Sequence, residues 1–273
     1  MVDPYFGDIA ERCSQRAHDA IASGEVPTQL PSWDDDQRGA PAAVVRSALF
    51  GVIKRGERKA VEQQTLASWA GNEVRYTGFR LDQADLDCWL QVLHLARTSP
   101  LGREVRFTAG TFLRNIGRKG DGNTRRWLRR SLGRMQACGV CIRTADGREY
   151  QGPLISDFFV DEESGQYVVR INPLIADLFD EAYVKVSLEK RLTLPQGLPR
   201  HLHCYVQSHR ATPTHPHRIG LASLRAITGS ETEMKDFRRK VRRAMEELQR
   251  AGVVASWRIT EGDALEFVRP EHT

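Results

Sequence analysis

The chain lacks any long apolar run. Its longest uncharged apolar stretches are short, such as residues 47–53, whereas a membrane-spanning helix needs about 18 to 20 apolar residues. Residues 1–10 hold no basic leader followed by an apolar block, which predicts that no secretory signal is present. We therefore expect a cytoplasmic protein with no membrane partner.

Cysteine is also scarce. The 273 residues include five cysteines, which are odd in number and scattered along the chain. Such a set does not fit a disulfide framework, but it suits a reducing compartment. Hydrophobic residues make up 40% of the chain and charged residues 27%, so it can bury one large core or two ordinary ones.

Acidic residues are few where basic residues gather. Residues 1–37 hold eight acidic and two basic residues, although the whole chain carries a net charge of +5. Residues 118–134 hold seven basic residues and one acidic residue, and residues 235–243 hold six basic residues and one acidic residue. Positive charge focused in this way is typical of proteins with a polyphosphate partner, so it predicts binding of nucleic acid.

The two basic stretches belong to a tandem repeat. Residues 125–132 (RRWLRRSL) align with residues 238–245 (RRKVRRAM), and the register continues without a gap until Gly139 falls on Gly252. After a small change of offset, residues 113–116 also align with residues 224–227. Each unit is therefore predicted to contain a short helix, a turn, a longer basic helix, a glycine stop and two strands.

Each basic helix is predicted to be amphipathic. In the second unit the apolar residues recur with the helical period, and they are Phe237, Val241, Ala244, Met245 and Leu248. In the first unit Leu128, Leu132 and Met135 form the corresponding stripe. The opposite faces are basic and lack the acidic partners of an ordinary solvated helix surface, so we interpret both helices as DNA-recognition helices. The predicted DNA-binding residues are Arg118, Lys119, Arg125, Arg126, Arg129, Arg130, Arg134, Lys235, Arg238, Arg239, Arg242 and Arg243.

Strand-prone segments follow each glycine stop. Turns at Asp146-Gly147 and Gly262-Asp263 separate short runs that favour hairpins, and helix, turn, basic helix and hairpin in that order describe a winged helix. In the first unit, residues 154–160 and 167–171 are expected to add further strands. We therefore predict an α+β fold with an acidic flexible N-terminal arm (1–37), a first winged-helix domain with extra strands (38–194) and a second winged-helix domain (195–273).

Five other segments have a predicted secondary structure. Residues 47–53 and 74–79 are expected to be strands, and residues 82–97 a helix with Leu86, Trp89, Leu90 and Leu93 facing inward. Residues 199–209 are expected to form the first helix of the second domain. Residues 183–194 are expected to be a strand or a short helix with a connector.

Three motifs suggest other chemistry, and each is incomplete. Residues 117–122 (GRKGDG) lack the Gly-Lys-Ser/Thr ending of a phosphate loop and follow a helix rather than a strand. Cys138 and Cys141 have the C-x-x-C spacing of a zinc site, but the repeat places them at positions that suit small buried residues. His201-Leu202-His203 resembles the metal-binding pair of rolling-circle nickases, yet the last tyrosine, Tyr205, is only two residues later. We therefore predict no catalytic residue, no metal and no cofactor, and a protein that is not an enzyme.

Several ordered motifs together resemble the TrfA family of plasmid replication initiators. They are residues 46–50 (RSALF), residues 76–78 (YTG), residues 81–96 (LDQADLDCWLQVLHLA), residues 208–210 (SHR) and the tandem basic helices. The similarity covers about residues 29–269. By position, Arg125, Arg126, Arg129 and Arg130 match the first recognition helix of the family, and Lys235, Arg238, Arg239, Arg242 and Arg243 match the second.

The resemblance implies an initiator that binds double-stranded DNA at short direct repeats, called iterons, in a plasmid origin. It also implies that the protein promotes origin opening, helps load the host replicative helicase with or without DnaA, and exists in a monomer–dimer equilibrium. The family has a sliding-clamp peptide near its N-terminus, which Gln29, Leu30 and Trp33 match, although Ser32 stands where an apolar residue is expected. The alternative is a two-domain winged-helix transcriptional regulator that reads an inverted repeat.

Overall fold

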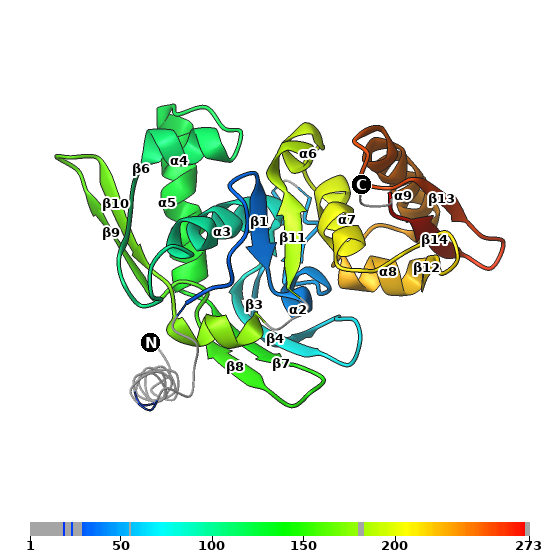
Figure 1. Ribbon diagram of the computed structural model, residues 1–273, viewed down its shortest axis with the longest axis horizontal. Coiled ribbons are helices and arrows are strands. Elements are labelled where there is room, and N and C mark those ends of the chain that lie inside the picture. The colour runs from blue at the N-terminus through cyan, green and yellow to red at the C-terminus, as the bar shows by residue number, and fades with distance from the viewer. Residues whose placement is uncertain (1–18, 20–22, 24–28, 55, 180–182, 271–273) are drawn as a thin grey trace.

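The computed structural model describes residues 19, 23, 29–54, 56–179 and 183–270. The molecule is elongated, with one winged-helix unit at each end and small sheets between them (Figure 1). In the described part of the chain, no helix is long and apolar enough to cross a membrane. The predicted α+β fold with two tandem winged helices is confirmed.

The first winged-helix unit lies at the left of Figure 1. Its elements are, in order, α3 (Gln83–Ala96), β6 (Val105–Thr108), α4 (Ala109–Asn115), α5 (Gly122–Gln136), β9 (Asp157–Asp161) and β10 (Gln166–Arg170). The three strands form an antiparallel sheet in the order β6-β10-β9. Helices α4 and α5 form the helix-turn-helix, and the β9–β10 hairpin is the wing.

The second unit repeats this plan at the other end of the molecule (Figure 1). Its elements are α7 (Leu198–Gln207), β12 (His217–Gly220), α8 (Leu221–Ile227), α9 (Met234–Arg250), β13 (Ser256–Ile259) and β14 (Ala264–Val268). Its sheet order, β12-β14-β13, corresponds strand for strand to that of the first unit. Helix α7 occupies the segment in which a helix over 199–209 was expected.

The wing of the first unit is not the hairpin that the sequence predicts. The hairpin after the glycine stop consists of β7 (Gly139–Arg143) and β8 (Glu149–Gly152), and it joins β4 (Glu73–Phe79) and β3 (Ala60–Leu66) in a separate four-stranded sheet. The true wing, β9–β10, is the pair of strands expected as extra. The error arises because both hairpins have local strand signals, while pairing of β7 with the distant β4 depends on tertiary structure.

Short elements fill the middle of the molecule. Strand β1 (Gln37–Ala40) pairs antiparallel with β11 (Val184–Ser187), which continues into α6 (Leu188–Thr193), as expected for a strand or short helix there. The strand expected over 47–53 is reduced to β2 (Phe50–Gly51), which pairs parallel with β5 (Leu81–Asp82). The remaining elements are α2 (Ala42–Val45) and the 3-10 helix η1 (Pro173–Leu178).

Helix α3 is the central helix of the first unit, and its start is determined locally. The Asp82 side chain caps the backbone amides of Ala84 and Asp85, and the Asp85 carboxylate accepts the amide of Asp82. This reciprocal capping box satisfies amides that the first turn would leave unpaired. The four residues predicted to face inward from this helix are all buried.

Two hydrophobic clusters form the core. The first surrounds α3, α4, α5 and the sheets of the N-terminal part, and the second lies among α7, α8, α9 and the β12–β14 sheet. Residues 29–37, expected to belong to a flexible arm, differ from that expectation, because Leu30 and Trp33 are buried in the first cluster with exposures of 4% and 5%. The rest of the predicted arm lies outside the described residues, apart from Asp19 and Ser23.

Candidate nucleic-acid interface

Helix α5 presents the first basic surface. Its N-terminal cap is Asp121, whose carboxylate accepts the amide of Thr124 at 2.8 Å, and this hydrogen bond lowers the pKa of Asp121. The predicted apolar stripe of Leu128, Leu132 and Met135 is buried, as expected. The helix therefore packs on one face and presents the opposite face to solvent.

A buried carboxylate holds α5 against α3. Asp85 is inaccessible to solvent, and its oxygens accept from Ser131 Oγ at 2.6 Å, from Arg134 at 2.5 Å and from Arg58 at 2.9 Å. Burial alone would raise the pKa of Asp85, but its contacts with Arg134 and Arg58 hold it below the ordinary value. Because Arg134 is committed to this pair, we assign it a structural role and correct its predicted place among the DNA-binding residues.

The outward face of α5 carries arginines around a hollow. Asn123, Arg126, Arg129 and Arg130 line this hollow, and Arg125 is exposed beside it. The Arg126 guanidinium donates to the side-chain amide oxygen of Asn123. No acidic side chain among the described residues pairs with Arg126 or Arg130, so both guanidinium groups are available to an anionic partner.

Arg129 connects α5 to its wing. Its guanidinium pairs with Glu162, beside the β9–β10 turn, at 3.0 Å, and donates to the Tyr167 hydroxyl at 3.4 Å. These two contacts raise the pKa of Arg129, with Tyr167 contributing most. The sequence argument missed Glu162, because its pairing with the helix depends on the fold of the wing.

The loop before α5 also carries predicted residues. The Arg118 guanidinium lies 3.7 Å from the ring centroid of Trp127, which is a cation–π contact. Lys119 is exposed, and its carbonyl accepts the Thr124 hydroxyl. The loop is therefore tied to the first turns of α5, and residues 117–121 form the turn between α4 and α5.

Helix α9 presents the second basic surface. Its predicted apolar residues, Phe237, Val241, Ala244, Met245 and Leu248, are all buried. Lys235, Arg239, Arg242 and Arg243 are exposed. Arg239 pairs with Asp236 at 3.0 Å, while no acidic side chain in the described residues pairs with Arg242 or Arg243.

The second wing is also joined to its recognition helix by an ion pair. Arg238 of α9 pairs with Asp263, which lies in the turn between β13 and β14. Arg238 is therefore half-buried rather than fully presented to solvent. In both units one arginine of the recognition helix holds the wing. Among the described residues, Arg126, Arg130, Arg242 and Arg243 have no acidic partner.

The histidine and cysteine motifs occupy other environments. His201 and His203 lie in α7 and are buried, with exposures of 2% and 0%. The Cys138 thiol is buried and donates to the Met135 carbonyl at 3.2 Å, and Cys141 is half-buried on β7. Among the described residues, no three His, Cys, Asp or Glu side chains are grouped as a metal site would require.

The predicted clamp peptide is not an accessible segment. Gln29 is exposed, but Leu30 and Trp33 are part of the core. The Trp33 indole donates to His94 at 3.1 Å and stacks on Phe179 with ring centroids 6.0 Å apart. The apolar residues that a clamp would recognise are therefore buried within the chain, and clamp binding by this segment stays a prediction.

Comparison with known proteins agrees with this architecture. The TrfA protein family matches residues 25–266. The plasmid replication initiator protein TrfA of Escherichia coli is 30% identical over 82% of this chain, which spans 60% of that relative's length. RepFIB replication protein A of Salmonella typhi is 26% identical over 88% of this chain and 80% of the relative.

Solved structures share the fold at low sequence identity. Domains 2 and 3 of RctB superpose with a TM-score of 0.58 at 14% identity, covering 85% of this chain and 98% of that one. The Pi initiator protein, solved in complex with iteron DNA, superposes with a TM-score of 0.52 at 14% identity, covering 68% of this chain and 92% of that one. The family match and the 30% identity show that the chain belongs to the TrfA family of plasmid replication initiators.

Proposed function

We propose that this chain initiates plasmid replication by binding iterons, the direct repeats of a plasmid origin, in the cytoplasm of the bacterial host. The observation that carries the proposal is the presence in one chain of two winged-helix units, each with a recognition helix that presents arginines without an acidic partner among the described residues. These arginines include Arg126 and Arg130 on α5, and Arg242 and Arg243 on α9. Two covalently joined winged-helix units with different recognition helices suit a directional DNA site rather than a palindrome. The Pi initiator, which shares the fold, was solved with iteron DNA.

The interaction follows from the chemistry of the two helices. A major groove admits an α-helix, and arginine recognises guanine O6 and N7 there, while other cations neutralise phosphates. These roles suit exposed arginines that lack an acidic partner among the described residues, such as Arg126, Arg130, Arg242 and Arg243. The wing arginines, Arg129 and Arg238, keep each wing beside its recognition helix.

Downstream steps complete the proposal. Binding to several iterons promotes opening of an adjacent AT-rich segment, and the bound protein helps load the host replicative helicase with or without DnaA. The protein acts as an assembly factor without catalysis, and a monomer–dimer equilibrium limits how many copies are active.

A map of the binding sites tests the proposal. Purified protein is incubated with fragments of the whole replicon that encodes it, and the retained DNA is sequenced. We expect a cluster of evenly spaced direct repeats next to an AT-rich tract. A single inverted repeat at the promoter of the gene would instead support the transcriptional regulator, and metal-dependent cleavage would support a nickase. An Arg130→Ala, Arg242→Ala variant is the matched control that should retain no specific fragment.

A further inference from the structure

The six-residue helix α6 lies between the two winged-helix units (Figure 1). Three consecutive side chains of α6 reach three different elements. Lys190 reaches the end of α9, Arg191 reaches α3, and Leu192 reaches the turn between α4 and α5. Helix α6 therefore contacts parts of both units that position the recognition helices.

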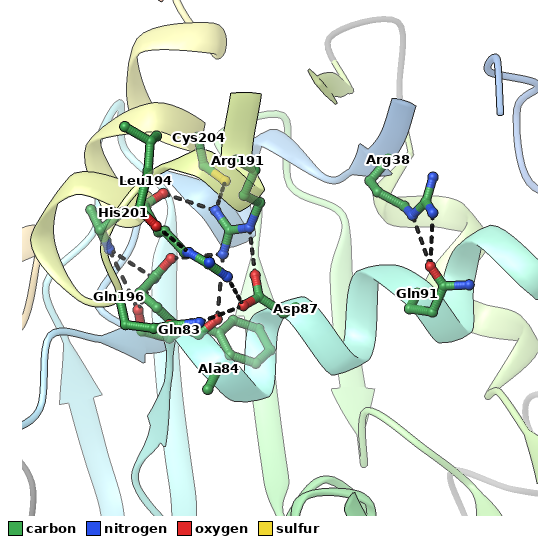
Figure 2. A network of polar contacts seen from close by, with 12 residues as sticks. Arg38, Gln83, Ala84, Asp87, Gln91, Arg191, Leu194, Gln196, His201 and Cys204 are labelled. Atoms are coloured by element: carbon green, nitrogen blue, oxygen red, sulfur yellow. Dashed lines mark hydrogen bonds and ion pairs between the residues drawn. The ribbon is translucent and has the colours of Figure 1, made fainter. Parts of the chain in front are cut away.

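Arg191 forms the central contact, and its side chain is 1% exposed. Its Nε donates to one oxygen of Asp87 at 2.6 Å, and its other nitrogens donate to Gln83 Oε1 at 3.1 Å and to the Arg200 carbonyl at 2.9 Å (Figure 2). Asp87 and Gln83 belong to α3, and Arg200 belongs to α7. One guanidinium thus joins the core helix of the first unit to the first helix of the second.

The second oxygen of Asp87 strengthens this junction. It accepts from Arg200 and from Gln196 Nε2, the latter at 2.9 Å (Figure 2). Arg200 Nε also donates to the Leu194 carbonyl at 3.0 Å, which fixes the connector between α6 and α7. Separation of α3 from α6 or α7 would remove a partner of the buried Asp87 carboxylate and leave an uncompensated charge. The cost of that charge restricts the relative positions of the three helices.

The two neighbours of Arg191 act at the recognition helices. Lys190 Nζ donates to the Gly252 carbonyl at 2.8 Å, just beyond the C-terminus of α9. Leu192 packs on Gly117 so closely that a Cβ there would lie 3.0 Å from Leu192 Cδ2. Gly117 has a positive φ of 69° and lies in the turn that leads into α5. Each end of this contact chain therefore limits movement of one recognition helix.

We propose that α6 is a spacer that fixes the distance and rotation between α5 and α9, and thereby sets the spacing of the two DNA segments that one chain reads. The claim about the spacing of the DNA segments rests on the proposed function, whereas the claim that α6 holds the two units rigidly does not. Two inserted base pairs rotate the second segment by about 70° and move it by about 7 Å. If α6 holds the units rigidly, this insertion should lower the affinity of the chain for the DNA strongly. If α6 is loosened, the affinity should fall only a little.

The test compares Arg191→Met with Arg38→Met in the full chain. Arg38 of β1 is buried and donates at 2.8 and 3.0 Å to Gln91, which belongs to α3 as Asp87 does (Figure 2). The hydrogen bonds of its side chain reach only α3 and residues 35–37, and not α6, α7 or α9. Spin labels are attached through a keto-bearing residue at the exposed positions Glu163 and Glu246, which leaves the cysteines unmodified. We expect one narrow distance distribution for the unsubstituted chain and for Arg38→Met, and a broadened one for Arg191→Met. An unchanged narrow distribution in Arg191→Met overturns the proposal.

A milder variant decides the question if Arg191→Met does not fold. Lys190→Ala, Leu192→Ala changes two half-buried side chains and leaves the Asp87 network in place. We again expect a broadened distribution, and an unchanged distribution in this folded variant overturns the spacer.

DNA binding supplies the second measurement. The mapped site and the same site with two base pairs inserted between its two protected segments are titrated with each protein. We expect the insertion to weaken the unsubstituted chain and Arg38→Met at least ~10-fold, and the folded spacer variant less than ~3-fold. If the insertion lowers the affinity of all these proteins equally, α6 does not set the spacing of the DNA segments. If the unsubstituted chain binds no DNA, the proposed function fails, while the label distances still decide whether α6 holds the units rigidly.

Discussion

Arginines on the two recognition helices divide into groups with different surroundings. Arg134 is paired with buried Asp85, and Arg129 and Arg238 are paired with acidic residues of the wings. Arg126 and Arg242 have no acidic partner among the described residues. The charge count in the sequence locates all of these arginines but does not separate them, because their partners come from other elements. The surroundings of each guanidinium therefore decide which arginines remain for DNA.

Arg126→Ala and Arg239→Ala should each weaken specific DNA binding. Arg239 is 71% exposed, and its pair with Asp236 within one helix is of the weak surface kind, so DNA can displace it. If each side chain contacts a base, the expected loss is about 1 to 3 kcal/mol in fluorescence anisotropy titrations. Arg143→Ala is the control, because Arg143 is an exposed arginine of β7 outside both helices. Full affinity in both test variants would remove these residues from the interface.

Trp33→Ala should destabilise the folded chain rather than remove a docking peptide. The indole is buried, stacks on Phe179 and donates to His94. Truncation of a buried tryptophan costs about 3 to 5 kcal/mol, which urea unfolding would measure. Gln29→Ala is the control, since Gln29 is exposed and should change stability little. A Trp33→Ala protein of unchanged stability would contradict the burial of this segment.

Helices follow from the sequence more closely than strands do. The stripes of α5 and α9 have the helical period and a polar opposite face, so local pattern alone identifies them. The sequence places the wing of the first unit at β7–β8 and not at β9–β10, because strand propensity does not tell which partner a strand will pair with. The sheet that receives β7 begins with residues more than fifty positions earlier in the chain.

Asp85→Asn tests how α5 is held in place. The substitution removes the negative charge of a buried carboxylate that pairs with Arg134 and Arg58 and accepts a hydrogen bond from Ser131. We therefore expect a loss of about 3 to 5 kcal/mol in the free energy of unfolding. The control is Asp157→Asn, which breaks an exposed pair with Arg170 and should cost at most about 1 kcal/mol. Equal stability losses in the two variants would contradict a special role for Asp85.

Several buried histidines make the stability of the whole molecule depend on pH. Burial is the main cause that lowers the pKa of His201 to about 4 and that of His209 to about 3, from an ordinary value of 6.5. In the window from about pH 6.5 down to about pH 4, the unfolded chain therefore binds more protons than the folded chain. Stability should fall as the pH is lowered through this window, by roughly 2 to 3 kcal/mol from His201 alone.

Urea unfolding at pH 7 and pH 4.5 measures this dependence. His201→Gln should lose less stability than the unsubstituted chain between the two pH values, because glutamine does not titrate. His215→Gln is the control, since His215 is exposed and should leave the difference unchanged. A His201→Gln protein with the same pH dependence as the unsubstituted chain would contradict the lowered pKa.

The relative placement of the two units is a property of the whole molecule that sequence patterns did not reveal. Asp87 lies more than 100 positions before Arg191 and Arg200 in the chain, and no local period links it to them. The repeat identifies two similar units, but their separation depends on α6 and on buried contacts between elements. The predicted domain boundary at residue 194 remains a prediction.

The central claim is that one chain reads two adjacent DNA segments with two different helices. Hydroxyl-radical footprinting of one mapped repeat tests it most directly, with the unsubstituted chain, Arg126→Ala, Arg130→Ala and Arg239→Ala, Arg242→Ala. The account predicts two protected segments for the unsubstituted chain, with the first variant losing protection of one segment and the second variant losing the other. Loss of the same segment in both variants, or of neither, would contradict the account.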